Sequence, residues 1–275
     1  MSNDLEALPD LVEPHEVPDG LVESFRADGH GVVRGLASPD EVAAYAPRIE
    51  ARGHDLAWDR RPLEERNTYG KAFLQSFNLW RADPAIARFV RAPRFAEVAA
   101  ALLGVTGIRL YHDQGLFKEP GGGPTPWHQD QFFWPLDTDA TVTMWMPLVP
   151  VPTEVGSMSF ASGSHLVTDL RGPGISDASE AEFARRIADL GLPIQSYGAM
   201  APGDATFHKG WTVHSAGPNP TETTRTVMTV IYVADGAHVS AVENDFQEFD
   251  RRAWLGGREA GQLVDHPRNP LLWAV

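Results

Sequence analysis

The sequence predicts a mainly β protein, an antiparallel sandwich or barrel with helices in front of it. Two observations predict this class. The 275 residues include 25 glycines and 22 prolines, a composition that favours many turns and short strands over a helical bundle. After Gly104, short runs with strand character alternate with Gly/Pro turns, whereas the segment before Gly104 carries signals for helix starts and helix ends.

The part of the chain before Gly104 is predicted to be mainly helical. Ser38 should begin a helix that runs to about Arg52, because a capping serine, a proline at the first helical position and acids in the first turn follow one another there. Residues 94–103 place apolar side chains at helical spacing, so we predict an amphipathic helix that Gly104 ends. The remaining elements expected here are a polar lead-in at residues 1–20, a short helix at 21–27 and a short strand at 31–34.

Short strands separated by turns make up most of the region after Gly104. The predicted strands are residues 108–118, 141–148, 157–160, 204–208, 212–215 and 225–233. An insertion at residues 166–201 interrupts them and should hold one helix, capped by Ser179 with Glu182 three residues later and ended by Gly191. Because connections of that length between strands are uncommon, we predict that the insertion is a lid.

Charge and residue content exclude several classes of protein. The formal net charge of −14 argues against nucleic acid or an anionic membrane as the main partner, since both require clustered Lys and Arg. The absence of cysteine excludes disulfides, thiolate zinc sites and cysteine nucleophiles. Residues 1–18 lack the apolar core of a signal peptide, and no apolar run approaches the ~20 residues of a membrane span. We therefore predict a cytoplasmic protein.

The segment Trp127-His128-Gln129-Asp130-Gln131 is the most informative for chemistry. In a strand, residues i and i+2 point to the same face, so His128 and Asp130 can reach one point in space. One imidazole and one carboxylate, completed by a distant histidine, make a facial triad for a divalent metal that leaves positions open for other ligands. A His-x-Asp alone is weak, because isolated instances are usually hydrogen-bonded polar pairs, and the chain has a further pairing at His112-Asp113.

The third metal ligand must come from the remaining histidines. His208 and His214 are the two candidates, because each lies in or next to a predicted strand, whereas most others lie in polar or terminal segments. The last predicted strand begins with Arg225 and is otherwise apolar. A buried arginine is costly unless an anion pairs with it, and a hairpin from His214 would bring Arg225 near the metal to bind a carboxylate. The alternative is an internal salt bridge.

Together these residues resemble the phytanoyl-CoA dioxygenase family of Fe(II)/2-oxoglutarate oxygenases. The resemblance covers roughly residues 108–233 and, more loosely, the helical region before them. The segments that carry it are Phe117-Lys118-Glu119-Pro120-Gly121, Trp127-His128-Gln129-Asp130, Thr143-Met144-Trp145-Met146-Pro147-Leu148, Gly156-Ser157-Met158, Gly163-Ser164-His165, Gly203-Asp204, His214, Asn219 and Arg225. Their order and spacing are specific, although no single segment is.

The resemblance implies a double-stranded β-helix, a jelly-roll and cupin-like fold, that uses Fe(II), 2-oxoglutarate and O2. The metal ligands implied are His128, Asp130 and His214, and Arg225 is the residue implied to bind the distal carboxylate of 2-oxoglutarate. Further candidates for cosubstrate contacts are Gln114, Thr143, Trp145 and Ser215. Many family members have Gly-Ser after the distal histidine, where this chain has Ser215-Ala216.

The expected substrate is a small hydrophobic metabolite or natural product. The candidate substrate-binding residues are Gln75, Asn78, Phe132, Phe133 and Trp134. Because halogenating relatives lack the carboxylate that Asp130 provides, the resemblance favours hydroxylation. Cyclisation, desaturation or epimerisation can follow from the same abstraction of a hydrogen atom. The identity of the substrate and the oligomeric state stay open.

Two other classes of function remain. One is a cupin-like metal-dependent hydrolase or isomerase, which has no need of Arg225, and the other is a catalytically silent metal-binding relative. For the domain organisation we predict a single oxygenase domain over residues 1–275. Its predicted parts are a mainly helical part at 1–105, a β-helix core at 106–235 with the lid at 166–201, and a C-terminal extension at 236–275.

Overall fold

The two faces of strand β5 (Thr141–Pro147) lie in different surroundings: one packs into the hydrophobic core and the other lines a cavity. In this computed structural model, which describes residues 3–275, Val142 and Met144 belong to the hydrophobic core on one face of the strand. Thr143 and Trp145, on the other face, line a cavity. Because successive side chains of a strand point to opposite faces, this apolar outer face and functional inner face follow directly from the sequence.

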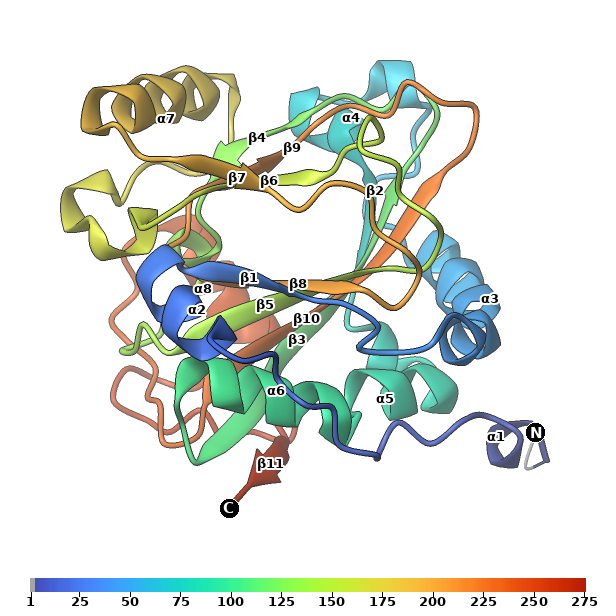
Figure 1. The fold of residues 1–275 in the computed structure, drawn as a ribbon. Helices are drawn as coiled ribbons and strands as arrows, with labels where there is room; N and C mark the ends of the chain where they lie inside the picture. Colours follow the sequence, from blue (N-terminus) through green and yellow to red (C-terminus); the bar gives the residue numbers. More distant parts are fainter. Residues whose placement is uncertain (1–2) are drawn as a thin grey trace.

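Two antiparallel sheets face each other (Figure 1). Residues of both sheets line the cavity. The large sheet has the order β1 (His30–Val33), β8 (Ala205–Lys209), β5, β10 (Arg225–Ala234), β3 (Gly107–Lys118) and β11 (Leu271–Ala274), and β2 (Leu74–Phe77) also pairs with β3. The small sheet has the order β4 (Thr125–His128), β9 (His214–Ala216), β6 (Met158–Ala161) and β7 (Ile194–Ser196). The predicted mainly β class is confirmed, and the arrangement is that of a jelly roll.

Helices α3 (Pro39–Asp55), α5 (Pro84–Val90) and α6 (Pro93–Leu103) cover the face of the large sheet that is turned away from the small sheet (Figure 1). The start of α3 is a capping box, in which Ser38 Oγ accepts from the Glu41 amide at 3.1 Å and the Glu41 carboxylate accepts from the Ser38 amide at 2.8 Å. The other helices are α1 (Asn3–Glu6), α2 (Leu21–Asp28), α4 (Thr68–Ala72), α7 (Asp177–Leu190) and α8 (Asp245–Ala253). The 3-10 turns are η1 (Leu63–Glu65), η2 (Leu79–Arg81), η3 (Asp130–Phe133), η4 (Ser164–Leu166) and η5 (Thr168–Leu170). No helix within residues 3–275 is both long and apolar enough to cross a bilayer.

The large sheet extends beyond the β core predicted at residues 106–235. Strands β1 and β2 come from the part predicted as mainly helical, and β11 comes from the C-terminal extension. Each pairs with a core strand, so the three predicted parts share one sheet. The sequence patterns did not reveal β2, β11, α5 or α8 as elements, because these segments are short and the strand that pairs with β2 and β11 lies far away in the chain.

The insertion at residues 166–201 packs against β4 through helix α7. Ser179 Oγ donates to the Trp127 carbonyl at 3.1 Å, and the Glu180 carboxylate accepts from the Trp127 amide at 2.7 Å. Phe183 and Ile187 are buried in a cluster beneath the helix. The N-cap is Ser176, three residues before the predicted Ser179, because Ser176 and Ser179 form the capping box with each other.

We expect that, when substrate binds, only the loop at residues 171–175 of the insertion moves. Helix α7 is held by buried side chains and by two hydrogen bonds to β4, whereas Ile175 in the loop lines the cavity. In hydrogen exchange, amides of the loop should gain protection when substrate joins the iron and 2-oxoglutarate complex, while those of α7 stay protected throughout. Equal protection of the loop in both states would make the insertion a fixed part of the scaffold.

Candidate metal centre and cosubstrate site

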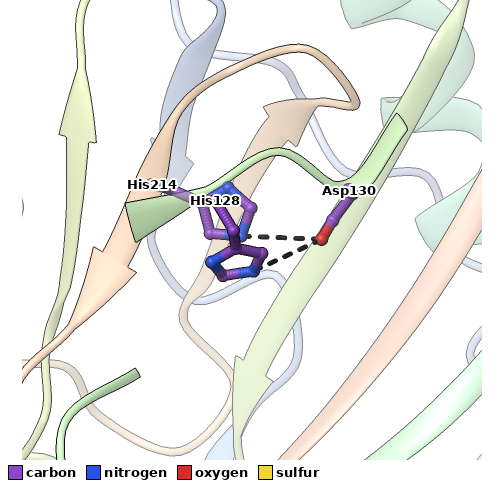
Figure 2. Close-up of side chains that lie close together, drawn as sticks. All are labelled: His128, Asp130 and His214. Carbon is purple, nitrogen blue, oxygen red and sulfur yellow. Dashed lines mark ion pairs between the residues drawn. The ribbon is translucent and has the colours of Figure 1, made fainter. Parts of the chain in front are cut away.

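Two histidines and one aspartate converge at the edge of the small sheet. His128 ends β4, His214 begins β9, and the two residues are register partners. Their Nε2 atoms lie 3.6 Å (His128) and 3.7 Å (His214) from Oδ1 of Asp130 (Figure 2). The three ligand atoms lie within 4.8 Å of one another, so they can share a single metal ion.

The secondary structure at Asp130 differs from the prediction. We predicted that His128 and Asp130 share the face of one strand, but β4 ends at His128 and Asp130 begins the turn η3. Gln129 between them is still extended, so the carboxylate points toward the two imidazoles (Figure 2). The predicted i, i+2 convergence of the two side chains therefore holds, although Asp130 itself lies in η3 and not in the strand.

The protein holds both imidazoles in the orientation that a metal ion requires. Nδ1 of His128 lies 2.7 Å from the Pro126 carbonyl, and Nδ1 of His214 lies 2.9 Å from the Thr212 carbonyl. A carbonyl can only accept, so each Nδ1 carries the proton and each Nε2 keeps a free lone pair. Burial lowers the pKa of both histidines, which keeps the rings neutral.

The second oxygen of Asp130 is fixed by two residues of the large sheet. Thr143 Oγ1 donates to Oδ2 at 2.9 Å, and His208 Nε2 lies 3.2 Å from the same oxygen. Burial alone would raise the pKa of Asp130, but the surrounding histidines hold it well below its usual range. The carboxylate is therefore ionised and presents Oδ1 to the metal position.

His208 and His214 were the two candidates for the third ligand, and both lie at this centre. Their ring centroids are 4.2 Å apart. Within the described part of the chain, the converging group of possible ligands contains His214 and not His208. His208 lies opposite Thr143 in the large sheet and contacts the far side of the Asp130 carboxylate.

A second feature is a pair of buried basic side chains, of which Arg225 lines the cavity. Arg225 begins β10, Lys118 ends β3, and the two residues are register partners. Both side chains are buried, and no carboxylate of the described residues lies within ion-pair distance of either. Burial lowers the pKa of Lys118 to about 6, and the positive charge of Arg225 acts in the same direction. A buried guanidinium without a counter-ion, beside an amine that can take up a proton, forms a site for an anion.

The Arg225 guanidinium is positioned by its neighbours but keeps unused donors. It donates to the Gly156 carbonyl at 2.7 Å and lies 5.3 Å from the centroid of the Trp145 ring, while its Nε has no partner among the described residues. A Cβ on Gly156, whose φ is +57°, would lie 2.9 Å from the guanidinium and 2.8 Å from the Gly217 carbonyl. A side chain at this position would therefore crowd the anion site.

The predicted hairpin from His214 to Arg225 does not form. His214 lies in the small sheet, whereas β10 lies in the centre of the large sheet. The connection crosses from one sheet to the other, and Arg225 faces the triad from the opposite wall of one shared cavity.

The cavity has a volume of about 750 Å³ and contains the triad, Arg225 and most of the predicted contact residues. Those that line it are Gln75, Gln114, Phe133, Trp134, Thr143, Trp145 and Ser215. Gln75 donates to Gln114 at 2.6 Å and accepts from Tyr69 at 3.1 Å, which fixes both amides on the wall. Strand alternation places Ala216, not Ser215, on the same face of β9 as His214.

Phe132 and Asn78 lie outside the residues that line the cavity. The Phe132 ring packs against Phe133 and Phe246. Asn78 has a φ of 52° in the tight turn before η2, and its Oδ1 accepts from Trp80 Nε1 at 3.1 Å. A left-handed asparagine in a turn is a common structural role, and no contact places it near the triad.

Several residues that line the cavity were missed in the sequence. His112 lies on the inner face of β3 together with Gln114, so strand alternation could have identified it. Trp58 and Phe249 line the mouth from a loop and from α8. No local pattern marks those two aromatic residues, because only the fold brings their segments together.

A family model described as phytanoyl-CoA dioxygenase (PhyH) matches residues 25–227. The chain belongs to the phytanoyl-CoA dioxygenase family. The match contains the triad and Arg225, and it leaves α8 and β11 outside its bounds.

Curated relatives and a solved structure agree with this membership. A protein named probable alpha-ketoglutarate-dependent hypophosphite dioxygenase, from Stutzerimonas stutzeri, is 31% identical over 161 residues, which cover 56% of this chain and 54% of that protein. An ectoine dioxygenase from Stutzerimonas stutzeri strain A1501 is 26% identical over 285 residues, which cover 96% and 89%. The crystal structure of the epimerase SnoN with Fe3+, alpha-ketoglutarate and nogalamycin RO superimposes with a TM-score of 0.76 at 28% identity, covering 92% of this chain and 97% of SnoN.

These comparisons confirm the predicted class of this family member. It is an iron- and 2-oxoglutarate-dependent dioxygenase with a jelly-roll fold. The alignment spans about half the length of the hypophosphite dioxygenase but nearly all of the ectoine dioxygenase. The relatives differ in what they act on, so the substrate has to be inferred from this chain's own cavity.

Proposed function

We propose that this protein oxidises a C–H bond of a small, mainly hydrophobic molecule, with His128, Asp130 and His214 as iron ligands and Arg225 as the anchor for 2-oxoglutarate. The observation that carries the proposal is the juxtaposition of two sites in one cavity. One part of the wall holds a ready triad with both Nε2 atoms free, and another part holds the buried Arg225 guanidinium, which has no carboxylate partner among the described residues. A dicarboxylic keto acid that chelates iron at one end and carries a carboxylate at the other fits both.

The residues fit the metal and the cosubstrate by their chemistry. Two neutral imidazoles and one carboxylate would hold an Fe(II) ion and would leave room among its ligands for a bidentate keto acid and O2. When bound, iron, 2-oxoglutarate and O2 together supply the oxidant that removes a hydrogen atom from the substrate. The chain itself contributes orientation: Thr143 and His208 hold Asp130, and Trp145 and the Gly156 carbonyl hold Arg225.

The walls beyond the triad exclude water and place the substrate. Phe133, Trp134 and Phe77 supply apolar surface, and the hydrogen-bonded amides of Gln75 and Gln114 supply polar contacts. We infer hydroxylation as the default outcome because Asp130 fills the position that halogenating relatives leave open. The solved relative SnoN is an epimerase rather than a hydroxylase, so analysis of the product must decide which reaction this protein catalyses.

The direct experiment combines binding with turnover. Fe(II) and 2-oxoglutarate are titrated under anaerobic conditions, and formation of the visible chelate band is followed. Candidate metabolites are then screened with O2 for succinate release coupled to product mass. A chelate band without any substrate-dependent succinate release across hydrophobic candidates would contradict the proposed substrate class. Absence of the band would contradict the assignment of the cosubstrate site.

Replacing Thr143 by valine should weaken metal binding without removing a ligand. The change keeps the shape of the side chain but deletes the hydroxyl that donates to Asp130 Oδ2. Loss of such an outer hydrogen bond typically costs 10- to 100-fold in metal affinity. Fe(II) or Co(II) titration measures the effect, and Thr229→Val is the matched control, because Thr229 also lines the cavity but does not contact the triad. Equal affinities in the two variants would show that the hydroxyl does not support the site.

Binding of 2-oxoglutarate is expected to take up a proton through Lys118. Its pKa of about 6 leaves the amine mostly neutral at pH 8, and a carboxylate placed beside it favours the ammonium form and raises that pKa. The complex then holds a proton that the free protein lacks, so affinity should rise as the pH falls from 8 toward 6. Calorimetry in buffers of different ionisation enthalpy measures the uptake. Uptake that persists in Lys118→Met would assign the proton to another group.

A further inference from the structure

The mouth of the cavity is surrounded by aromatic side chains that the fold leaves in solvent. Among the described residues, the exposed phenylalanine and tryptophan side chains are Trp58, Phe246 and Phe249. All three line this one cavity, with exposed fractions of 72%, 55% and 45%. Exposed apolar surface that gathers at a cavity mouth marks a binding surface, because packing alone would have buried it.

These rings pack edge to face against one another and against neighbouring aromatic rings. Trp58 meets Phe249 at 5.9 Å and 82°, and Phe249 meets Trp254 at 5.7 Å and 85°. Phe246, which lies on α8 with Phe249, meets Phe133 at 5.3 Å and 80°. Edge-to-face pairs are a favoured aromatic geometry, and a flat aromatic ligand entering between the two groups can continue the same pattern.

The mouth is tied to the metal-binding turn. Gln247 of α8 donates to the Phe132 carbonyl at 3.2 Å, and Phe132 lies in η3, the turn that Asp130 begins. On the opposite side, the Trp58 amide donates to the Gln75 carbonyl of β2 at 2.8 Å. A molecule held at the mouth is therefore placed at a fixed distance from the iron position.

The inner wall offers a polar contact at the level of the triad. His112 is only 2% exposed and lines the cavity, and its Nδ1 makes no hydrogen bond within ordinary geometric limits. His112 of β3 pairs with Ile231 of β10, and Ile231 pairs in turn with Thr143 of β5. His112 is therefore level in the sheet with Thr143, which donates a hydrogen bond to Asp130. Burial lowers the pKa of His112 to about 4, so the ring is neutral and can donate or accept.

The charges that line the mouth favour a neutral ligand over a polyanion. Among the described residues that line it there, Arg61 is the cation, and its guanidinium donates two hydrogen bonds to Asp59. Asp245 of α8 adds an acidic group to the rim. The phosphates of a coenzyme A thioester would have to compete with Asp59 for Arg61, whereas a neutral ligand would not.

We propose that the substrate is a flat, neutral, polycyclic aromatic molecule whose outer rings lie against Trp58, Phe246 and Phe249 and whose inner oxygen substituent hydrogen-bonds to His112. This inference rests on the proposed function, since it assigns the substrate of the same site. The family model matches residues 25–227, so Trp58 lies inside the match, whereas α8, which carries Phe246 and Phe249, lies outside it.

The test uses the intact protein loaded anaerobically with Fe(II) and 2-oxoglutarate, and isothermal titration calorimetry as the readout. The probe is 1,8-dihydroxyanthraquinone, and the comparison ligand is androstane-3,17-diol, a saturated polycycle of similar size. We expect the anthraquinone to bind at least tenfold more tightly. Trp58→Leu and Phe249→Leu should each weaken it by roughly three- to tenfold, which is the range for losing one aromatic pair.

Two further variants make the test specific. Trp211→Leu removes a half-buried indole that does not line the cavity and should leave affinity unchanged. His112→Leu should weaken the dihydroxyanthraquinone by roughly three- to tenfold but not unsubstituted anthracene. Equal binding of the saturated polycycle, or full affinity in the Trp58 and Phe249 variants, would overturn the inference. The chelate band is recorded in the same samples, so a failure of the 2-oxoglutarate site is seen separately as its absence.

Discussion

Replacing His214 by alanine is expected to abolish turnover and to lower Fe(II) affinity by more than roughly a hundredfold, because outer-sphere changes alone cost 10- to 100-fold and this change removes a ligand. Only one imidazole and one carboxylate would remain, and they hold Fe(II) poorly. His128→Ala and Asp130→Ala should behave in the same way. The measurements are metal titration and succinate release, with circular dichroism to check that the fold is intact.

His208→Ala provides the contrast that makes this prediction specific. His208 is as buried as His214 and approaches the same carboxylate, but it contacts Oδ2 rather than the metal position. We expect this variant to keep its iron with a loss of at most about 10- to 100-fold in affinity. If His208→Ala lost the metal while His214→Ala retained it, the assignment of the third ligand would be reversed.

Arg225→Ala is expected to weaken 2-oxoglutarate binding by at least a hundredfold. Removing one partner of a buried charge pair costs on the order of 3–5 kcal/mol, and every 1.4 kcal/mol corresponds to a factor of ten. We expect Lys118 to compensate only in part, because burial, the main cause of its low pKa, remains when Arg225 is removed. Fe(II) affinity should change little, since Arg225 does not contact the triad. The anaerobic chelate band, titrated with 2-oxoglutarate, measures the loss.

Arg109→Ala is the matched control for this variant. Arg109 also lies on a strand of the large sheet, but it pairs with Asp235 outside the cavity. The control should bind 2-oxoglutarate as the unaltered protein does. If Arg225→Ala kept its dependence on 2-oxoglutarate, the cosubstrate assignment would fail, and a metal-dependent hydrolase or isomerase that needs no such arginine would regain support.

Features that depend on neighbours in the chain were predictable. The capping box at Ser38 and the end of α6 at Gly104 follow from local hydrogen bonding and backbone conformation. The strands β3, β5 and β10 follow from apolar patterning, and their inner and outer faces from the two-residue repeat. The order and spacing of the motifs were enough to indicate the family. The same local reasoning misplaced the cap of α7, because two serines three residues apart offer two possible starts.

The sequence alone determined the class of fold, the kind of chemistry and a short set of candidate ligands. Only the tertiary structure decided how those candidates divide their roles. His208 and His214 are equivalent as sequence, and the register of two different sheets places one behind Asp130 and the other beside the metal position. The cation pair and the aromatic mouth likewise arise from contacts between segments more than a hundred residues apart, such as Lys118 with Arg225 and Trp58 with Phe249. Such contacts leave no local pattern, because nothing in either segment alone constrains the other.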